Sequence, residues 1–215
     1  MIYKFNIKNI YLKISNIERI AFITTILIGL LTHIFMFTNV LPNWDSMYNF
    51  KSNSIWIDMG RWFLNESMKV SSIYDLPWII GILSLIFIGI TSAIIVNLLE
   101  IKRKISAITI SAIIVTFPVV TSTFSYLFLA DGYMMGMMLS TISIFITQKY
   151  HKGYWGGGII LAFSIGIYQT NLAFAGILAL LIIIKDIIDS DSNVSDVINC
   201  AIKFILTAII GVVVY

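Results

Sequence analysis

The chain has 215 residues, of which 59% are hydrophobic and 12% are charged. A typical soluble domain carries about 45–50% apolar and about 25% charged residues. The composition excludes a soluble globule, because too few polar side chains remain to cover a core of this size. The apolar residues also run in blocks of about 20, the length that crosses a bilayer. We therefore predict an all-α, polytopic transmembrane protein.

The first apolar block follows a basic N-terminal stretch. In a membrane protein the position of each charge matters more than the net charge of +3, because basic flanks stay on the cytoplasmic side. Residues 1–19 carry four basic residues and one acid, and Ile20–Leu41 follows them. We expect a cytoplasmic N-terminus and a first extracytoplasmic loop at residues 42–76. His33, inside the first span, is expected to hydrogen-bond a neighbouring helix.

Three further blocks lie at Pro77–Leu99, Ile105–Thr121 and Tyr133–Gln148. Basic clusters at residues 102–104 and 149–152 follow the first and the third of these blocks. Both clusters predict the same orientation, with the two connections on the cytoplasmic side.

The block Tyr154–Ile184 has 31 residues, too many for one upright helix and few for two full ones. We expect two short helices that turn near Tyr168 and Gln169, since polar side chains within a span are costly. One long tilted helix is the alternative. With a last span at Ile198–Tyr215, we predict about seven membrane segments in a single domain, residues 1–215, as the N-terminal part of a longer protein.

The first outer loop contains an amphipathic pattern. From Ser54 to Val70, apolar side chains recur at helical spacing, and Asp58 and Arg61 fall on another face. We predict a helix that lies in the membrane interface, with Trp62 in an aromatic belt around it. The alternative is a plain anchoring helix in which Asp58 and Arg61 form only a solvated ion pair.

Other polar residues are expected on the same side of the membrane. Asp45 closely follows the first span, where a carboxylate can face a cavity between helix ends, although an acid in an outer loop is usually solvated. Asp131 precedes the block at Tyr133, and its alternative role is a helix N-cap. Tyr168 and Gln169 join this side if the hairpin forms, and their alternative role is a polar turn or an interhelical hydrogen bond.

Taken in chain order, these elements match a known pattern. It consists of Asp45 outside the first span, Gly60-Arg61-Trp62, Pro118 with Tyr126 and Asp131, and Gly166-Ile167-Tyr168-Gln169. The pattern resembles the bacterial Gtr-type glucosyltransferases, membrane enzymes that decorate O-antigen and related surface glycans. The resemblance covers most of the chain, and its Gly-Arg-Trp and Gly-Ile-Tyr-Gln elements are the most specific.

The resemblance implies the GT-C architecture in the bacterial cytoplasmic membrane, with the active site at the outer face. It implies a polyprenyl-phosphate-linked sugar, typically glucose, as the donor and a surface glycan as the acceptor, with no nucleic-acid partner. Related enzymes carry a catalytic acid in the first outer loop, where this chain has Asp45. Ser46 follows it instead of a second acid, which leaves open whether Asp58 or Asp131 supplies another carboxylate. We expect no cofactor and predict no metal ligand, and a divalent-metal requirement stays open.

The residue types suit this chemistry. Transfer from a lipid phosphate needs a base for the proton of the acceptor hydroxyl and positive charge beside the departing phosphate. Asp45 is the candidate catalytic base, and Arg61 is the candidate phosphate partner because a guanidinium suits bidentate contact. The candidate donor-binding residues are Asp58, Arg61, Trp62, Asp131, Tyr168 and Gln169. Two rival functions remain, a transporter or flippase for a lipid-linked sugar and a non-catalytic membrane subunit.

Overall fold

The computed structural model describes residues 14–39, 45, 53–71, 76–188 and 193–215. Within these ranges the protein is built from helices and has no strand, which confirms the predicted all-α class. The elements are α2 (Asn16–Thr38), α4 (Asn53–Asp58), α5 (Leu64–Met68), α6 (Pro77–Leu98), α7 (Lys104–Thr116), α8 (Pro118–Thr123), the 3-10 helix η1 (Phe124–Tyr126), α9 (Leu127–Lys149), α10 (Gly153–Ile167), α11 (Thr170–Ile188) and α12 (Val194–Val214).

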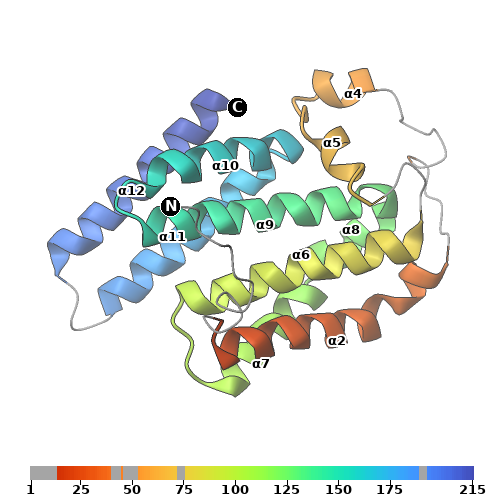
Figure 1. The fold of residues 1–215 in the computed structure, drawn as a ribbon, viewed down its shortest axis with the longest axis horizontal. Coiled ribbons are helices and arrows are strands. Elements are labelled where there is room, and N and C mark those ends of the chain that lie inside the picture. Colours follow the sequence, from red (N-terminus) through yellow and green to blue (C-terminus); the bar gives the residue numbers. More distant parts are fainter. Residues whose placement is uncertain (1–13, 40–44, 46–52, 72–75, 189–192) are drawn as a thin grey trace, which may run out of the picture.

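Among the described residues, five segments are long and apolar enough to cross a membrane. One of them, Lys104–Lys149, contains α7 and α9, which run in opposite directions (Figure 1). Large apolar side chains point outward from these segments, such as Leu31 with 81% of its surface exposed, as expected where lipid replaces water. The number of about seven membrane segments stays a prediction, because α7 and α10 have only 13 and 15 residues.

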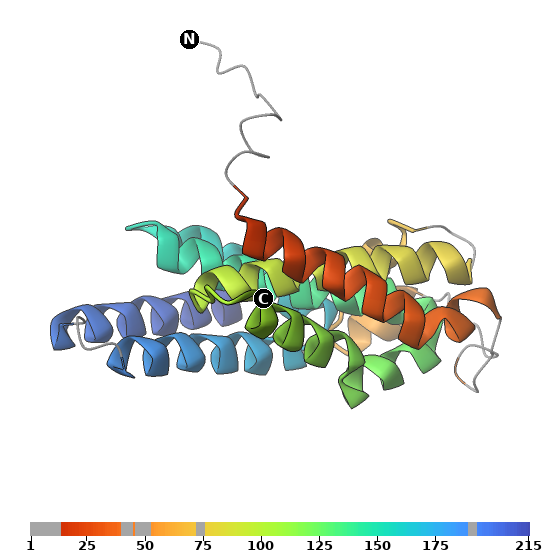
Figure 2. The same cartoon turned by 90° about the horizontal axis from the view of Figure 1, so that it is seen from below.

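The long helices lie roughly along one direction, and α9 runs between α6 and α10 (Figures 1 and 2). On one side, α2 packs against α6 and α7. Buried His33 of α2 donates a hydrogen bond from Nε2 to the Val115 carbonyl of α7, at 2.9 Å. The predicted contact of this histidine with a neighbouring helix is therefore confirmed.

On the other side, hydroxyl and amide groups join α9 to the helices around it. The hydroxyls of Ser140 and Ser164 lie 2.8 Å apart, and Asn171 Nδ2 donates to the Ser164 carbonyl at 3.0 Å. The hydroxyls of Thr147 and Thr207 lie 2.9 Å apart. All five side chains are buried, and interhelical hydrogen bonds of this kind satisfy polar groups that lipid cannot.

The basic connections gather at one end of the fold. Lys185, near the end of α11, forms a 2.7 Å ion pair with Glu100, which follows α6. The connections α6–α7 and α9–α10 and the C-terminal end of α11 lie toward this end in Figure 1. The two basic clusters therefore lie on the same side, as predicted, and we name this the basic end. The side of the membrane that it faces stays a prediction.

The hairpin predicted within Tyr154–Ile184 is confirmed. Helix α10 ends at Ile167, and α11 begins at Thr170 and returns toward the basic end (Figure 1). The alternative of one long tilted helix is wrong, because the chain is extended at Tyr168 between the two helices.

Two expectations about helix bounds are corrected. The single amphipathic helix predicted from Ser54 to Val70 is two short helices, α4 and α5, because Gly60 adopts a left-handed turn between them. Helix α9 begins at Leu127 rather than at Tyr133, since the buried residues Leu129 and Ala130 continue its packed face toward the N-terminus.

Candidate functional site

The turn between α4 and α5 positions Arg61 in the site. Gly60 has a φ of 75°, a conformation that glycine adopts without the steric cost that a Cβ brings. The chain reverses tightly here, because the Gly60 N–H donates to the Ile57 carbonyl at 2.8 Å and the Arg61 N–H to the Trp56 carbonyl at 2.7 Å. These bonds fix the backbone from which the Arg61 side chain projects.

The turn docks onto the connection between α10 and α11. The Phe63 N–H donates to the Gly166 carbonyl at 2.9 Å, and Gln169 Nε2 donates to the Met59 carbonyl at 2.8 Å. The Trp62 ring lies so close to Gly166 that an added Cβ there would be 2.6 Å from the ring. The two most specific sequence elements, Gly-Arg-Trp and Gly-Ile-Tyr-Gln, therefore touch directly.

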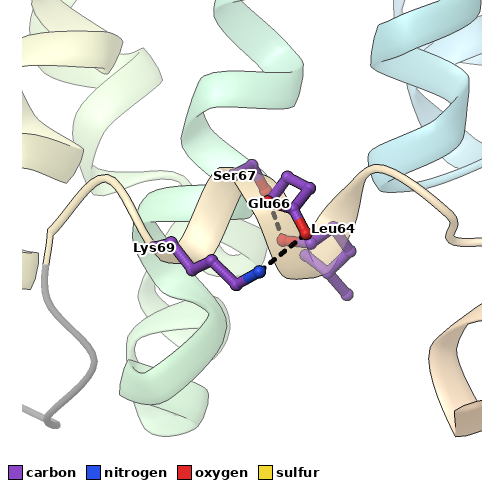
Figure 3. A network of polar contacts seen from close by, with 4 residues as sticks. All are labelled: Leu64, Glu66, Ser67 and Lys69. Atoms are coloured by element: carbon purple, nitrogen blue, oxygen red, sulfur yellow. Dashed lines mark hydrogen bonds and ion pairs between the residues drawn. The ribbon is translucent and has the colours of Figure 1, made fainter. Parts of the chain in front are cut away.

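Helix α5 anchors the other side of the turn on α9. Leu64 and Ser67 are buried, and a Cβ added to Gly132 of α9 would lie 2.9 Å from the Ser67 hydroxyl. Figure 3 shows Ser67 Oγ donating to the Leu64 carbonyl at 2.7 Å and Lys69 Nζ paired with Glu66 at 2.7 Å. The charged pair stays at the exposed face, so only the face of α5 without charges packs on the bundle.

The Arg61 guanidinium lies among three aromatic rings. Its Nη1 donates to the Tyr133 hydroxyl at 3.0 Å. Its Cζ lies 4.7 Å from the ring centroid of Tyr168 and 5.8 Å from that of Trp56, within the range of cation–π attraction. Tyr133 and Tyr168 are themselves stacked, with centroids 5.0 Å apart.

These groups surround a cavity of about 430 Å³. Its lining residues are Asp45, Ile55, Trp56, Met59, Arg61, Tyr126, Phe128, Leu129, Tyr133 and Tyr168. The lining thus combines one carboxylate, one guanidinium and five aromatic side chains. A carboxylate can take a proton from a hydroxyl, and a guanidinium can bind phosphate oxygens. Mostly apolar pockets with a few convergent polar groups are typical of small-molecule sites.

Three of the predicted site residues meet at this cavity. Asp45, half-buried, lies in the first outer loop, Arg61 in the turn between α4 and α5, and Tyr168 between α10 and α11. The Asp45 carboxylate is also close enough to Tyr133 for a Coulomb interaction.

The other predicted residues lie outside the lining. Asp58 is exposed at the end of α4, and no ion pair joins it to Arg61 among the described residues. Trp62 packs on Gly166, and Gln169 is used in holding the turn. Asp131 is buried within α9, where Oδ1 accepts from the Gly132 N–H at 2.9 Å. The suggested N-cap role of Asp131 is wrong, because the N-cap of α9 is Tyr126.

Several residues of the site were not predicted from the sequence, among them Tyr133, the partner of Arg61, and Tyr215, which bonds to the turn. Tyr215 Oη donates to the Gly60 carbonyl at 2.8 Å and accepts from Gln169 Nε2 at 3.0 Å. Tyr133 is 72 positions from Arg61 and Tyr215 is 155 from Gly60. No local spacing rule connects such positions, although Tyr133 comes soon after Asp131, which belongs to the recognised pattern.

Metal-binding groups are sparse in the part of the chain that the structure describes. There, no three His, Cys, Asp or Glu side chains come close enough together to hold an ion. We assign no metal centre within these ranges.

Comparison with known protein families identifies a relationship for this chain. Residues 34–215 match the family model described as glucosyl transferase GtrII. No curated protein and no solved structure matches the chain significantly. The matched range covers most of the chain and includes Asp45, Arg61 and Tyr168, which line the cavity. The chain therefore belongs to the glucosyl transferase GtrII family.

Proposed function

We propose that this protein transfers glucose from a polyprenyl-phosphate donor to a surface glycan such as O-antigen, as a GT-C-type enzyme of the bacterial cytoplasmic membrane. Family membership supports glucosyl transfer. The observation that carries the proposal is the aromatic-lined cavity in which Asp45 and Arg61 are brought together. The proposed reaction is written without a cofactor, and a divalent-metal requirement stays open.

In the proposed step, Asp45 is the general base. The oxygen of an acceptor hydroxyl attacks the anomeric carbon of the donor sugar, and its proton passes to the Asp45 carboxylate. The bond between the anomeric carbon and the phosphate oxygen breaks, and the polyprenyl phosphate leaves with the electron pair. Direct displacement inverts the anomeric configuration.

Arg61 supports the departing phosphate in this proposal. Negative charge grows on the phosphate oxygen as the bond breaks, and a fixed guanidinium beside it stabilises that charge. Tyr168 and the other aromatic rings supply flat apolar surfaces for the sugar. Trp62 and Gln169 support binding indirectly by holding the turn, while roles of Asp58 and Asp131 in donor binding remain predictions.

The cavity is well placed for a reaction at the outer face. It lies at the end of the fold that holds α4, α5 and the α10–α11 connection, opposite the basic end (Figure 1). Because basic connections remain in the cytoplasm, a site at the opposite end faces outward. A lipid-linked donor held in the outer leaflet then reaches it from the side.

Glucosylation by Asp45→Asn and Arg61→Ala variants tests the proposal. We expect each variant to lower transfer from polyprenyl-phosphate glucose at least a hundredfold, the range typical of a lost general base for Asp45→Asn and of a lost charge-stabilising donor for Arg61→Ala. The measurement is radiolabelled glucose incorporated into the surface glycan per amount of protein in the membrane. Glu66→Gln is the matched control, because Glu66 is an exposed acid of the same loop that pairs with Lys69. Full transfer by both cavity variants would contradict the proposal.

A further inference from the structure

The Tyr133 hydroxyl is a polar group of the cavity that the proposed chemistry does not use. Tyr133 belongs to α9, the helix that runs between α6 and α10 (Figure 1). Its phenol oxygen accepts the hydrogen bond from Arg61 Nη1, and its ring stacks on Tyr168. The residue therefore connects the turn that carries Arg61 to the body of the bundle.

Arg61 depends on such a connection to keep one orientation. Its side chain projects from a turn, and an arginine side chain that no partner holds samples many rotamers. The tyrosine oxygen meets the guanidinium at one Nη1 hydrogen, and a guanidinium has five N–H donors and no acceptor. Arg61 Nε is buried from solvent and has no hydrogen-bond partner in the described part of the chain. Donors are thus left over for an anionic ligand.

We propose that Tyr133 is a positioning residue, whose hydroxyl orients Arg61 so that the remaining guanidinium donors bind the phosphate of the lipid-linked sugar. This inference rests on the proposed function. Tyr168 assists by stacking on Tyr133 and by lying under the guanidinium. The hydrogen of the Tyr133 hydroxyl is not used toward Arg61, since arginine accepts no hydrogen bond.

The test is Tyr133→Phe in the full-length protein, purified in detergent. This variant loses the hydroxyl and keeps the ring that stacks on Tyr168, so the protein should still fold, with its thermal midpoint lowered by no more than the loss of one hydrogen bond. We expect kcat/KM for polyprenyl-phosphate glucose to fall about tenfold through a higher KM for the donor. The KM for the acceptor glycan should not change. Tyr154→Phe is the control, because it removes the same group from α10 near the basic end.

A double-mutant cycle tests whether Tyr133 acts through Arg61. The Kd of radiolabelled polyprenyl-phosphate glucose is measured for Tyr133→Phe, Arg61→Ala and both together. We expect Tyr133→Phe to add no loss in the Arg61→Ala background, since residues that act as one unit are not additive. Equal losses in both backgrounds, or an unchanged donor KM in Tyr133→Phe, would overturn the inference. If Arg61→Ala itself binds the donor normally, the inference fails, and the proposed function fails with it if Asp45→Asn also transfers normally.

Discussion

At the scale of single residues, the site depends on the conformation of Gly60. Its φ of 75° lies in the left-handed region, and its carbonyl accepts the hydrogen bond from Tyr215. The next residue is Arg61, so any change in this turn moves the guanidinium. In the Gly-Arg-Trp element, the backbone conformation therefore requires the glycine. The arginine supplies the guanidinium that lines the cavity.

We expect Gly60→Ala to destabilise the protein and to lower transfer. A left-handed alanine costs roughly 1–2 kcal/mol, and the new Cβ would contact the Tyr215 hydroxyl and lie 2.9 Å from Gln169 Nε2. The measurement is the thermal midpoint in detergent, together with glucosyl transfer. Gly176→Ala is the control, because no atom lies within 4 Å of a Cβ there and alanine favours a helix. An equal thermal midpoint for wild type and Gly60→Ala would contradict this account.

At the scale of elements, the hairpin of α10 and α11 is fixed on α9 by buried polar groups. The Ser164 hydroxyl of α10 donates to the Gly136 carbonyl of α9 at 2.5 Å. Ser140 of α9 donates to the Asn171 carbonyl of α11 at 3.1 Å. Because lipid gives helices no hydrophobic reason to associate, such bonds help to hold the helices in register. The same hairpin presents Gly166, Tyr168 and Gln169 to the Arg61 turn.

Ser164→Ala should lower the free energy of unfolding by about 1 kcal/mol, the scale of an interhelical hydrogen bond in a membrane protein. Ser140 keeps its bond to the Asn171 carbonyl in this variant, so no buried group is left without a partner. Equilibrium unfolding in mixed micelles gives the value. Thr116→Ala serves as the control, because that hydroxyl bonds only to the Ala112 carbonyl of its own helix. The idea fails if both variants are equally stable.

At the scale of the whole molecule, the two ends of the bundle differ in charge and in role. The basic end carries the connection at residues 150–152, the cluster at 102–104 and the Lys185–Glu100 ion pair. The opposite end carries the Arg61 turn and the cavity. Apolar side chains cover the sides between them. This division fits a protein that crosses the membrane and works at one face.

Cysteine labelling tests this orientation. In a Cys200→Ser background, Lys152→Cys and Asn193→Cys should react with a membrane-impermeant maleimide only after the membrane is opened, because both positions are exposed at the basic end. Thr121→Cys, exposed on α8 near the other end, should react in intact spheroplasts. The opposite labelling pattern would place the cavity in the cytoplasm and remove the proposed donor from its reach.

The sequence by itself determined the class, the helices and the grouping of the basic connections. Hydropathy and charge are properties of each segment, so a span or a basic flank is visible without its neighbours. The turn at Tyr168 and Gln169 was also predictable from its own segment. Polar residues interrupt an apolar block there. Asp45, Arg61 and Tyr168 were found by residue type and by resemblance, and all three line the cavity.

Only the tertiary structure decided which polar residues act together. Met59 and Gln169 are bonded across 110 positions, and Arg61 and Tyr133 across 72. Such contacts depend on how the helices pack, which local patterns do not contain. Packing also excluded Asp58 from the cavity lining and enclosed Asp131 within α9. The sequence thus identified a membrane glucosyltransferase pattern, and the packing of distant segments around Arg61 produced its candidate site.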